Sequence, residues 1–73
     1  MTQLGEYFDK RSINKSSVSR KTGITKNRLS ELSNNPKTIL KAHELYLIAL
    51  AIEADPCELL DVVCGHLKLK NGK

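Results

Sequence analysis

Apolar residues recur along most of this chain at spacings of three and four positions, the period of one face of an α-helix. Polar stretches that carry Gly, Pro, Asn or Asp interrupt the pattern. The sequence therefore predicts an all-α fold with five helices. These are expected near residues 2–11, 15–22, 26–33 and 42–54, and from Pro56 to near Gly65.

The interruptions carry residues that cap helix ends. Asn14 and Thr25 each precede a helix, where a side-chain oxygen accepts hydrogen bonds from the first free backbone amides. Between them, Gly23 ends the second helix because glycine adopts the left-handed conformation at little cost. Asp55, followed by Pro56 at the first helical position, is typical of a helix start.

The third interruption reads Asn34-Asn35-Pro36. A residue directly before proline favours extended backbone, so Asn35 is expected to be extended. Asn34 is therefore predicted to be the left-handed cap of the third helix.

The helix over 26–33 has two unlike faces. Leu29 and Leu32 are spaced to enter the core, whereas the side chains opposite them are long and polar. Two short helices joined by a tight turn, over about residues 15–33, form a helix-turn-helix, whose second helix is shaped to enter a DNA major groove. The polar face consists of Lys26, Asn27, Ser30 and Glu31, with Arg28 at its flank.

The charges are unevenly distributed, although the net charge is only +4. Residues 10–41 carry nine basic side chains against one acid, Glu31, whereas residues 42–61 carry five acids and no base. A polyanion would meet the basic segment, although a solvated basic face has the same composition. The nine bases are Lys10, Arg11, Lys15, Arg20, Lys21, Lys26, Arg28, Lys37 and Lys41.

The residue types on the polar face suit base recognition. Asn27 pairs with both the donor and the acceptor of adenine, and Glu31 accepts from cytosine. Lys26 and Arg28 donate to guanine or to phosphate.

These residues resemble the Cro/C1-type (XRE-like, lambda-repressor-like) helix-turn-helix family. The resemblance is carried by Ile13-Asn14-Lys15 through Val18-Ser19, Gly23-Ile24-Thr25, Leu29-Ser30, Leu32 and Asp55 through Leu60. The resemblance covers about residues 4–60 and implies a compact five-helix DNA-binding fold that acts as a dimer on a palindromic operator. We expect the domain to span residues 1–65, with residues 66–73 as a short basic C-terminal tail outside the resemblance. The resemblance also implies that Thr25, Lys26, Asn27 and Glu31 face base edges and that Asn14, Lys15, Arg28 and Asn34 approach phosphates.

The helix over 42–54 is apolar nearly all round. Leu45, Ile48 and Ile52 already form a core stripe, so Leu47 and Leu50 belong to a second apolar face. A partner subunit could cover this face, or the leucines could be tolerated at the surface. A third possibility is that the C-terminal segment from Val62 covers it, with "HLKLK" as a short strand.

Other kinds of function have little support. A chain of 73 residues has a small core, and no nucleophile, phosphate-binding loop or close pair of metal ligands is evident, so we expect no enzyme, metal or cofactor. Cys57 and Cys64 lie seven positions apart in one helix, too far to form a disulfide. Without a membrane span or signal segment, the cytoplasm is the expected compartment.

The sequence favours a sequence-specific double-stranded DNA-binding transcriptional regulator, expected to be a stand-alone Cro-like repressor that forms a homodimer. One alternative is the antitoxin of a toxin–antitoxin pair, with the apolar face on the fourth helix binding the toxin. Another is a protein-interaction module with the same fold and no DNA binding.

Overall fold

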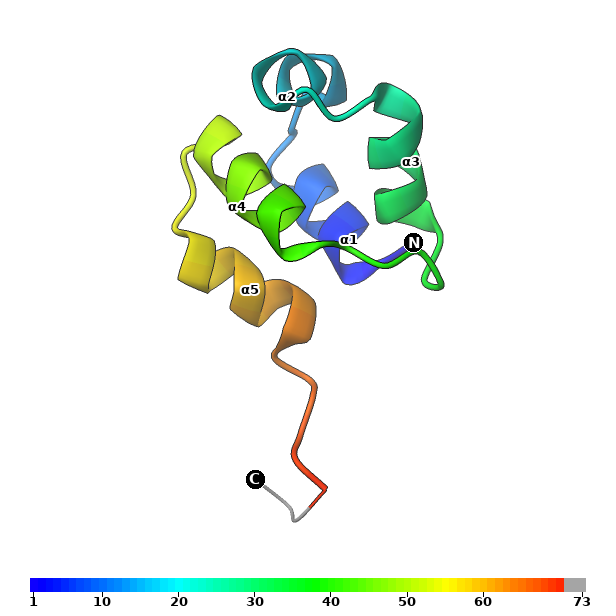
Figure 1. The fold of residues 1–73 in the computed structure, drawn as a ribbon, viewed down its shortest axis with the longest axis vertical. Helices are drawn as coiled ribbons and strands as arrows, with labels where there is room; N and C mark the ends of the chain where they lie inside the picture. The colour runs from blue at the N-terminus through cyan, green and yellow to red at the C-terminus, as the bar shows by residue number, and fades with distance from the viewer. Residues whose placement is uncertain (71–73) are drawn as a thin grey trace.

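The computed structural model describes residues 1–70 and contains five α-helices and, in that span, no strand. The helices form a bundle from which the C-terminal segment projects (Figure 1). They are α1 (Gln3–Lys10), α2 (Lys15–Thr22), α3 (Lys26–Asn34), α4 (Ala42–Ala51) and α5 (Pro56–Cys64). The predicted all-α class and five helices are confirmed.

Four predicted caps are confirmed because each depends on neighbouring residues alone. The side chains of Asn14, Thr25 and Asp55 accept from the backbone amides of Ser17, Arg28 and Cys57, respectively. Gly23 follows α2 with φ 80°, and its amide donates to the carbonyl of Ser19.

The predicted end of the third helix was wrong. Asn34 is the last residue of α3, and Asn35 is the C-cap in extended conformation, with φ −104°. The amide of Asn35 donates to the Glu31 carbonyl, and the side-chain amide of Asn34 donates to the Ser30 carbonyl. These bonds satisfy the last turn, so α3 needs no left-handed residue there.

The fourth helix is shorter than the predicted 42–54. It ends at Ala51 because Glu53 adopts a left-handed conformation, with φ 59°. The amides of Glu53 and Ala54 then donate to the carbonyls of Leu50 and Ala49, the two bonds of a Schellman motif. Glycine usually takes the left-handed position of this motif, so a glutamate there gave no sequence signal.

The core receives side chains from all five helices. Phe8, Leu29, Ile48 and Leu59, from α1, α3, α4 and α5, are at most 2 % exposed, and Val18 of α2 joins them. Within this core α3 packs against α1 and α2, and α4 packs against α2 and α5. The inner side of α3 is therefore enclosed on two sides while its outer side stays free.

The start of α1 is bonded directly to the end of α3. The backbone amide and the hydroxyl of Thr2 both lie within hydrogen-bond distance of the Ser33 carbonyl, at 2.8 and 2.9 Å, and the hydroxyl lies 2.7 Å from the Leu32 carbonyl. Gly5 allows this approach, because a Cβ at that position would lie 2.2 Å from the Ser33 carbonyl oxygen.

Candidate nucleic-acid interface

The outer face of α3 is a continuous polar ridge. Leu29, Leu32 and Ser33 are buried on the inner side, with Arg28 half-buried at the edge. Successive residues of a helix are rotated by about 100°, so every position on the opposite side belongs to one strip. Lys26, Asn27, Ser30, Glu31 and Asn34 occupy that strip, and all five are exposed.

Four ridge residues surround a shallow hollow of about 360 Å³: Asn27, Ser30, Glu31 and Asn34. The hollow thus brings together two predicted base-reading residues, Asn27 and Glu31. It also contains Asn34, which was predicted to approach phosphates, and Ser30, to which no role was given. Amide, hydroxyl and carboxylate groups in one concave strip offer both donors and acceptors to a base edge.

Glu31 and Asn34 are partly oriented by neighbours. The Glu31 carboxylate accepts from the side-chain amide of Asn35 at 3.3 Å and lies 3.4 Å from the Thr38 hydroxyl. Asn34 uses its amide nitrogen on the Ser30 carbonyl at 3.0 Å. Both side chains keep unused lone pairs that face solvent, so the ridge has acceptors in fixed positions.

The two capping residues lie at the starts of α2 and α3. Asn14 accepts through Oδ1 and Thr25 through Oγ1, each from a backbone amide at 3.1 Å. The Asn14 amide group and the Thr25 hydroxyl hydrogen stay free to donate. Lys15 is half-buried at the start of α2, whereas Lys26 is fully exposed at the start of α3.

Arg28 forms an ion pair that the sequence did not reveal. Its Nε lies 2.9 Å from Oε2 of Glu44, and its Nη2 lies 3.0 Å from Oε1 of Glu44 and 2.7 Å from the Ile39 carbonyl. Glu44 also accepts from the Lys41 amide at 3.0 Å. The start of α3 is therefore bonded to the start of α4 and to the loop between the two helices.

This environment changes the titration of Glu44. The Arg28 hydrogen bonds lower the pKa of the Glu44 carboxyl from 4.5 to about 2, against the opposing effect of burial. The same hydrogen bonds raise the pKa of Arg28. Because the Glu44 side chain is only 8 % exposed, these hydrogen-bond partners, and not water, stabilise its negative charge.

Two signals at Glu44 could have suggested this pair. Glu44 is the third residue of its helix, where a glutamate side chain reaches back to the preceding backbone amide. It also lies one turn before the core residue Ile48, on the same face of the helix. Its partner, 16 positions earlier in the chain, has no such local signature.

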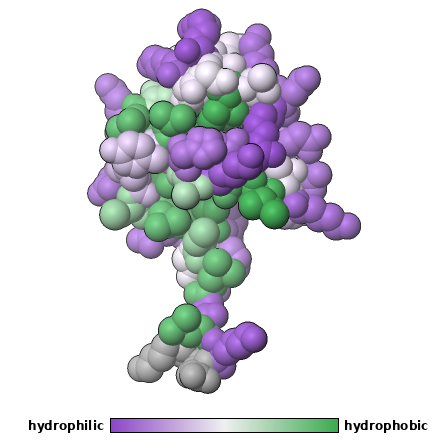
Figure 2. All heavy atoms as spheres, in the orientation of Figure 1, coloured by the Kyte–Doolittle hydropathy of each residue, from purple (hydrophilic) through white to green (hydrophobic). Residues whose placement is uncertain are grey.

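The basic segment is largely available to a ligand. Among the basic residues of positions 10–41, Arg28 forms an ion pair with a carboxylate in the part of the chain that the structure describes. The Arg11 guanidinium lies over the Tyr7 ring, 5.3 Å from its centroid. Hydrophilic surface gathers around α2 and along the α3 side, whereas hydrophobic patches lie around α4 and over α5, and the projecting tail shows both kinds of residue (Figure 2).

The apolar face of the fourth helix is narrower than expected. Leu47 is half-buried, whereas Leu50 is 55 % exposed and lies one turn from Tyr46, which is 54 % exposed. The C-terminal segment does not cover this face, since it runs away from the bundle (Figure 1) and residues 67–69 form no strand. In that segment, Leu67 and Leu69 are 65 % and 70 % exposed.

Across residues 1–70 there is no cluster of three or more His, Cys, Asp or Glu side chains able to hold a metal ion. None of the five helices has the length and apolar character to cross a bilayer.

Two short helices joined at a left-handed glycine, the second with a free polar face beside a basic surface, define a helix-turn-helix domain. The profile of the Cro/C1-type HTH DNA-binding domain family matches residues 3–65, and the chain belongs to this family. The match covers all five helices, and the family binds DNA and is not enzymatic. No curated protein and no solved structure matches the chain.

Proposed function

We propose that this protein is a sequence-specific double-stranded DNA-binding transcriptional regulator that acts as a Cro-like repressor. The observation that carries the proposal is the outer face of α3, where every residue from Lys26 to Asn34 on that side is polar and exposed. A repressor needs no catalytic group, because occupancy of an operator is sufficient to block access to it.

We assign a contact to each polar side chain of the helix-turn-helix according to its position. Thr25, Lys26, Asn27 and Glu31 would contact base edges, with Asn27 on adenine and Glu31 on cytosine. Asn14, Lys15 and Asn34 would donate to phosphates from the two ends of the helix-turn-helix. Arg28 would reach a phosphate only through Nη1, since Nε and Nη2 are bonded to Glu44 and Ile39.

The first test is a selection of binding sites from random duplexes, followed by titration of the selected site and a scrambled duplex. We expect the preferred site to be bound at least a hundredfold more tightly than scrambled DNA. This threshold is lower than the ratio of specific to non-specific affinity of typical DNA-binding proteins, which is roughly 10³–10⁷. If no duplex is enriched, the proposal is wrong.

The second test is salt dependence. If four to six of the free bases meet phosphates, log affinity should fall against log salt with a slope of about −4 to −5 per monomer. A slope near zero would instead favour a protein-interaction module.

We also propose that two copies bind a palindromic site in the cytoplasm, where Cys57 and Cys64 would stay free thiols, as they are in the structure. Leu50, with Leu47 at its half-buried edge, is the candidate contact face on α4 for a protein partner. A toxin on that face would make this an antitoxin, and co-purification of one partner at fixed stoichiometry would support that role.

A further inference from the structure

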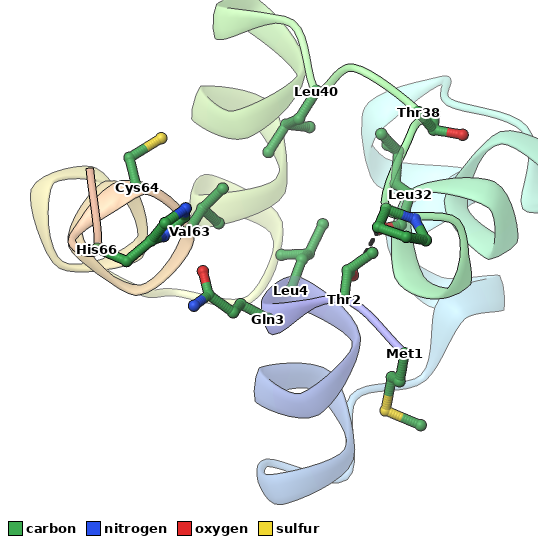
Figure 3. A pocket seen from close by; sticks show the side chains of 11 residues that line it. Met1, Thr2, Gln3, Leu4, Leu32, Thr38, Leu40, Val63, Cys64 and His66 are labelled. Atoms are coloured by element: carbon green, nitrogen blue, oxygen red, sulfur yellow. Dashed lines mark hydrogen bonds between the residues drawn. The ribbon is translucent and has the colours of Figure 1, made fainter. Parts of the chain in front are cut away.

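The start of α1, the loop before α4 and the end of α5 enclose a groove of about 460 Å³. Pockets that bind ligands are commonly of roughly 300–1,000 Å³. Leu4, Leu40 and Val63 point into a common space there (Figure 3). The groove is mostly apolar and lies outside the ridge on α3. Its lining is Met1, Thr2, Gln3, Leu4, Leu32, Pro36, Thr38, Leu40, Val63, Cys64 and His66.

The segment after His66 matches this groove in character. Leu67 and Leu69 alternate with Lys68 and Lys70, so in an extended chain the leucines lie on one side and the lysines on the other. Both leucines are at least 65 % exposed. Each forgoes the stabilisation of burial in this position, while an apolar groove in the same molecule stands open.

The charges are complementary as well. The groove includes Val63 and Cys64, the last residues of α5, where the C-terminal carbonyls form the negative end of the helix dipole. The last turn of α5 contains Asp61 and no basic residue. Lysines on an extended segment lying in the groove would supply the missing positive charge.

A segment cannot easily enter the groove from which it departs. The Gly65 amide donates to Asp61 and the Leu67 amide to Cys64, at 2.7 and 2.9 Å, and these bonds direct the chain away from the bundle. To fold back into its own groove, the chain would have to reverse direction at His66. A β-turn takes four residues, so Leu67 would lie within the turn and only Leu69 could reach the groove. The segment of a second copy meets no such restriction.

We propose that residues 67–70 of one copy dock into this groove of a second copy, and that the exchange is reciprocal, giving a two-fold symmetric dimer. In such an interface each copy contributes the same groove and the same arm. The exchange buries four leucines and places four lysines near the ends of the two α5 helices. It leaves the ridge on α3 free, and it does not depend on whether that ridge binds DNA.

The test compares two full-length double variants that each replace two exposed leucines. Leu67→Asp with Leu69→Asp alters the arm, whereas Leu50→Ser with Leu60→Ser alters the outer surfaces of α4 and α5, where these leucines are 55 % and 48 % exposed. Sedimentation over a concentration series measures the dissociation constant of the dimer, and circular dichroism confirms that the helices persist. We expect the arm variant to dimerise at least tenfold more weakly and the control to match the parent.

A third variant alters the groove itself. Cys64→Arg places a cation at the end of α5, which favours the helix but repels the lysines of an incoming arm, so it should weaken the dimer while keeping the fold. Isotope-filtered spectra of a mixed sample should show contacts of Leu67 and Leu69 methyls with Leu40 and Val63 of the other copy.

Three outcomes would overturn the proposal. The first is a parent chain that stays monomeric throughout the concentration series. The second is a dimer lost in the Leu50 and Leu60 variant and kept in the arm variant. The third is a set of arm contacts found only within one copy.

Discussion

The two faces of α3 differ in residue type and in how they are held. On the inner face, Leu29, Leu32 and Ser33 are at most 3 % exposed, and both ends of the helix are bonded to other elements. On the outer face, five polar side chains are exposed and contact only near neighbours in the chain. The inner face determines where the helix lies, and the outer face is free to meet a ligand.

This division separates stability from recognition along a single helix of nine residues. A substitution on the inner face should lower the free energy of unfolding, and one on the outer face should change affinity without changing stability.

Gly5→Ala should be the most damaging single change. The new Cβ would lie 2.2 Å from the Ser33 carbonyl oxygen, so α1 and α3 would have to move apart. Overpacking of this kind costs about 3 kcal/mol or more when backbone must shift, which exceeds the roughly 1 kcal/mol that alanine gains over glycine in a helix. Urea unfolding followed by circular dichroism measures the loss.

Gly23→Ala is the matched control for that change. Nothing lies within 4 Å of a Cβ at Gly23, so its effect comes from the backbone conformation alone, with φ 80°. That conformation costs an alanine about 1–2 kcal/mol. If Gly5→Ala proves less damaging than Gly23→Ala, the close contact of α1 with α3 is not what fixes the end of α3.

The Glu44 ion pair gives the second prediction, a dependence of stability on pH. The folded state lowers the pKa of Glu44 from 4.5 to about 2, so the pair stabilises the fold fully above pH 4.5. Its contribution is lost as the pH falls through the window from 4.5 to 2. Glu44→Gln should lower the free energy of unfolding by about 1–3 kcal/mol at pH 7 and flatten this part of the pH profile.

Glu58→Gln provides the comparison, because Glu58 is an exposed carboxylate near the start of α5. Urea unfolding at pH 7 and pH 3 should show the parent and Glu58→Gln losing similar stability, and Glu44→Gln losing less. Equal losses in all three would mean that the Arg28–Glu44 pair contributes nothing to the pH dependence.

The sequence predicted the outer face better than the inner attachments, for a physical reason. The ridge and its caps at Asn14 and Thr25 follow from helical periodicity and from contacts three residues apart. The bonds from Arg28 to Glu44 and from Thr2 to Leu32 join residues 16 and 30 positions apart. Such pairs depend on how the helices pack, and no local pattern encodes that.

Two left-handed residues after helix ends also escaped prediction, for a related reason. Ser12 and Glu53 adopt left-handed backbone, with φ 54° and 59°, after α1 and α4. Neither residue type prefers this conformation, so only the packing of the helices before and after each turn selects it. The predicted end of the fourth helix was wrong at Glu53 because its backbone conformation is not evident from its side chain.

Asn27→Ala tests the outer face directly. Because the side chain is exposed and touches a hollow and not the core, we expect stability to change by less than about 0.5 kcal/mol. Affinity for the selected site should fall by about 1–3 kcal/mol, with little change on scrambled duplex. Fluorescence anisotropy on both duplexes measures the two affinities.

Lys15→Ala is the counterpart at the start of α2, where the proposed contact is a phosphate. It should weaken binding to both duplexes alike, because every sequence carries the same backbone charge. If Asn27→Ala also weakens both alike, the outer face of α3 positions the protein and does not read bases.

The smallest effect is expected from two serines on opposite faces of α3. Ser33 is 1 % exposed, and its hydroxyl donates to the Leu29 carbonyl at 2.8 Å, whereas Ser30 is exposed beside Asn27 and Asn34. Ser33→Ala should lower the free energy of unfolding by about 0.5–1 kcal/mol, since the lost hydrogen bond is partly offset by the helix propensity of alanine. Ser30→Ala should leave stability within about 0.5 kcal/mol of the parent and lower only the affinity for the selected site. Urea unfolding and anisotropy on both variants give the two readouts. The reverse pattern, with Ser30→Ala unfolding more easily and Ser33→Ala binding less tightly, would mean that the two faces of α3 are not divided between recognition and stability.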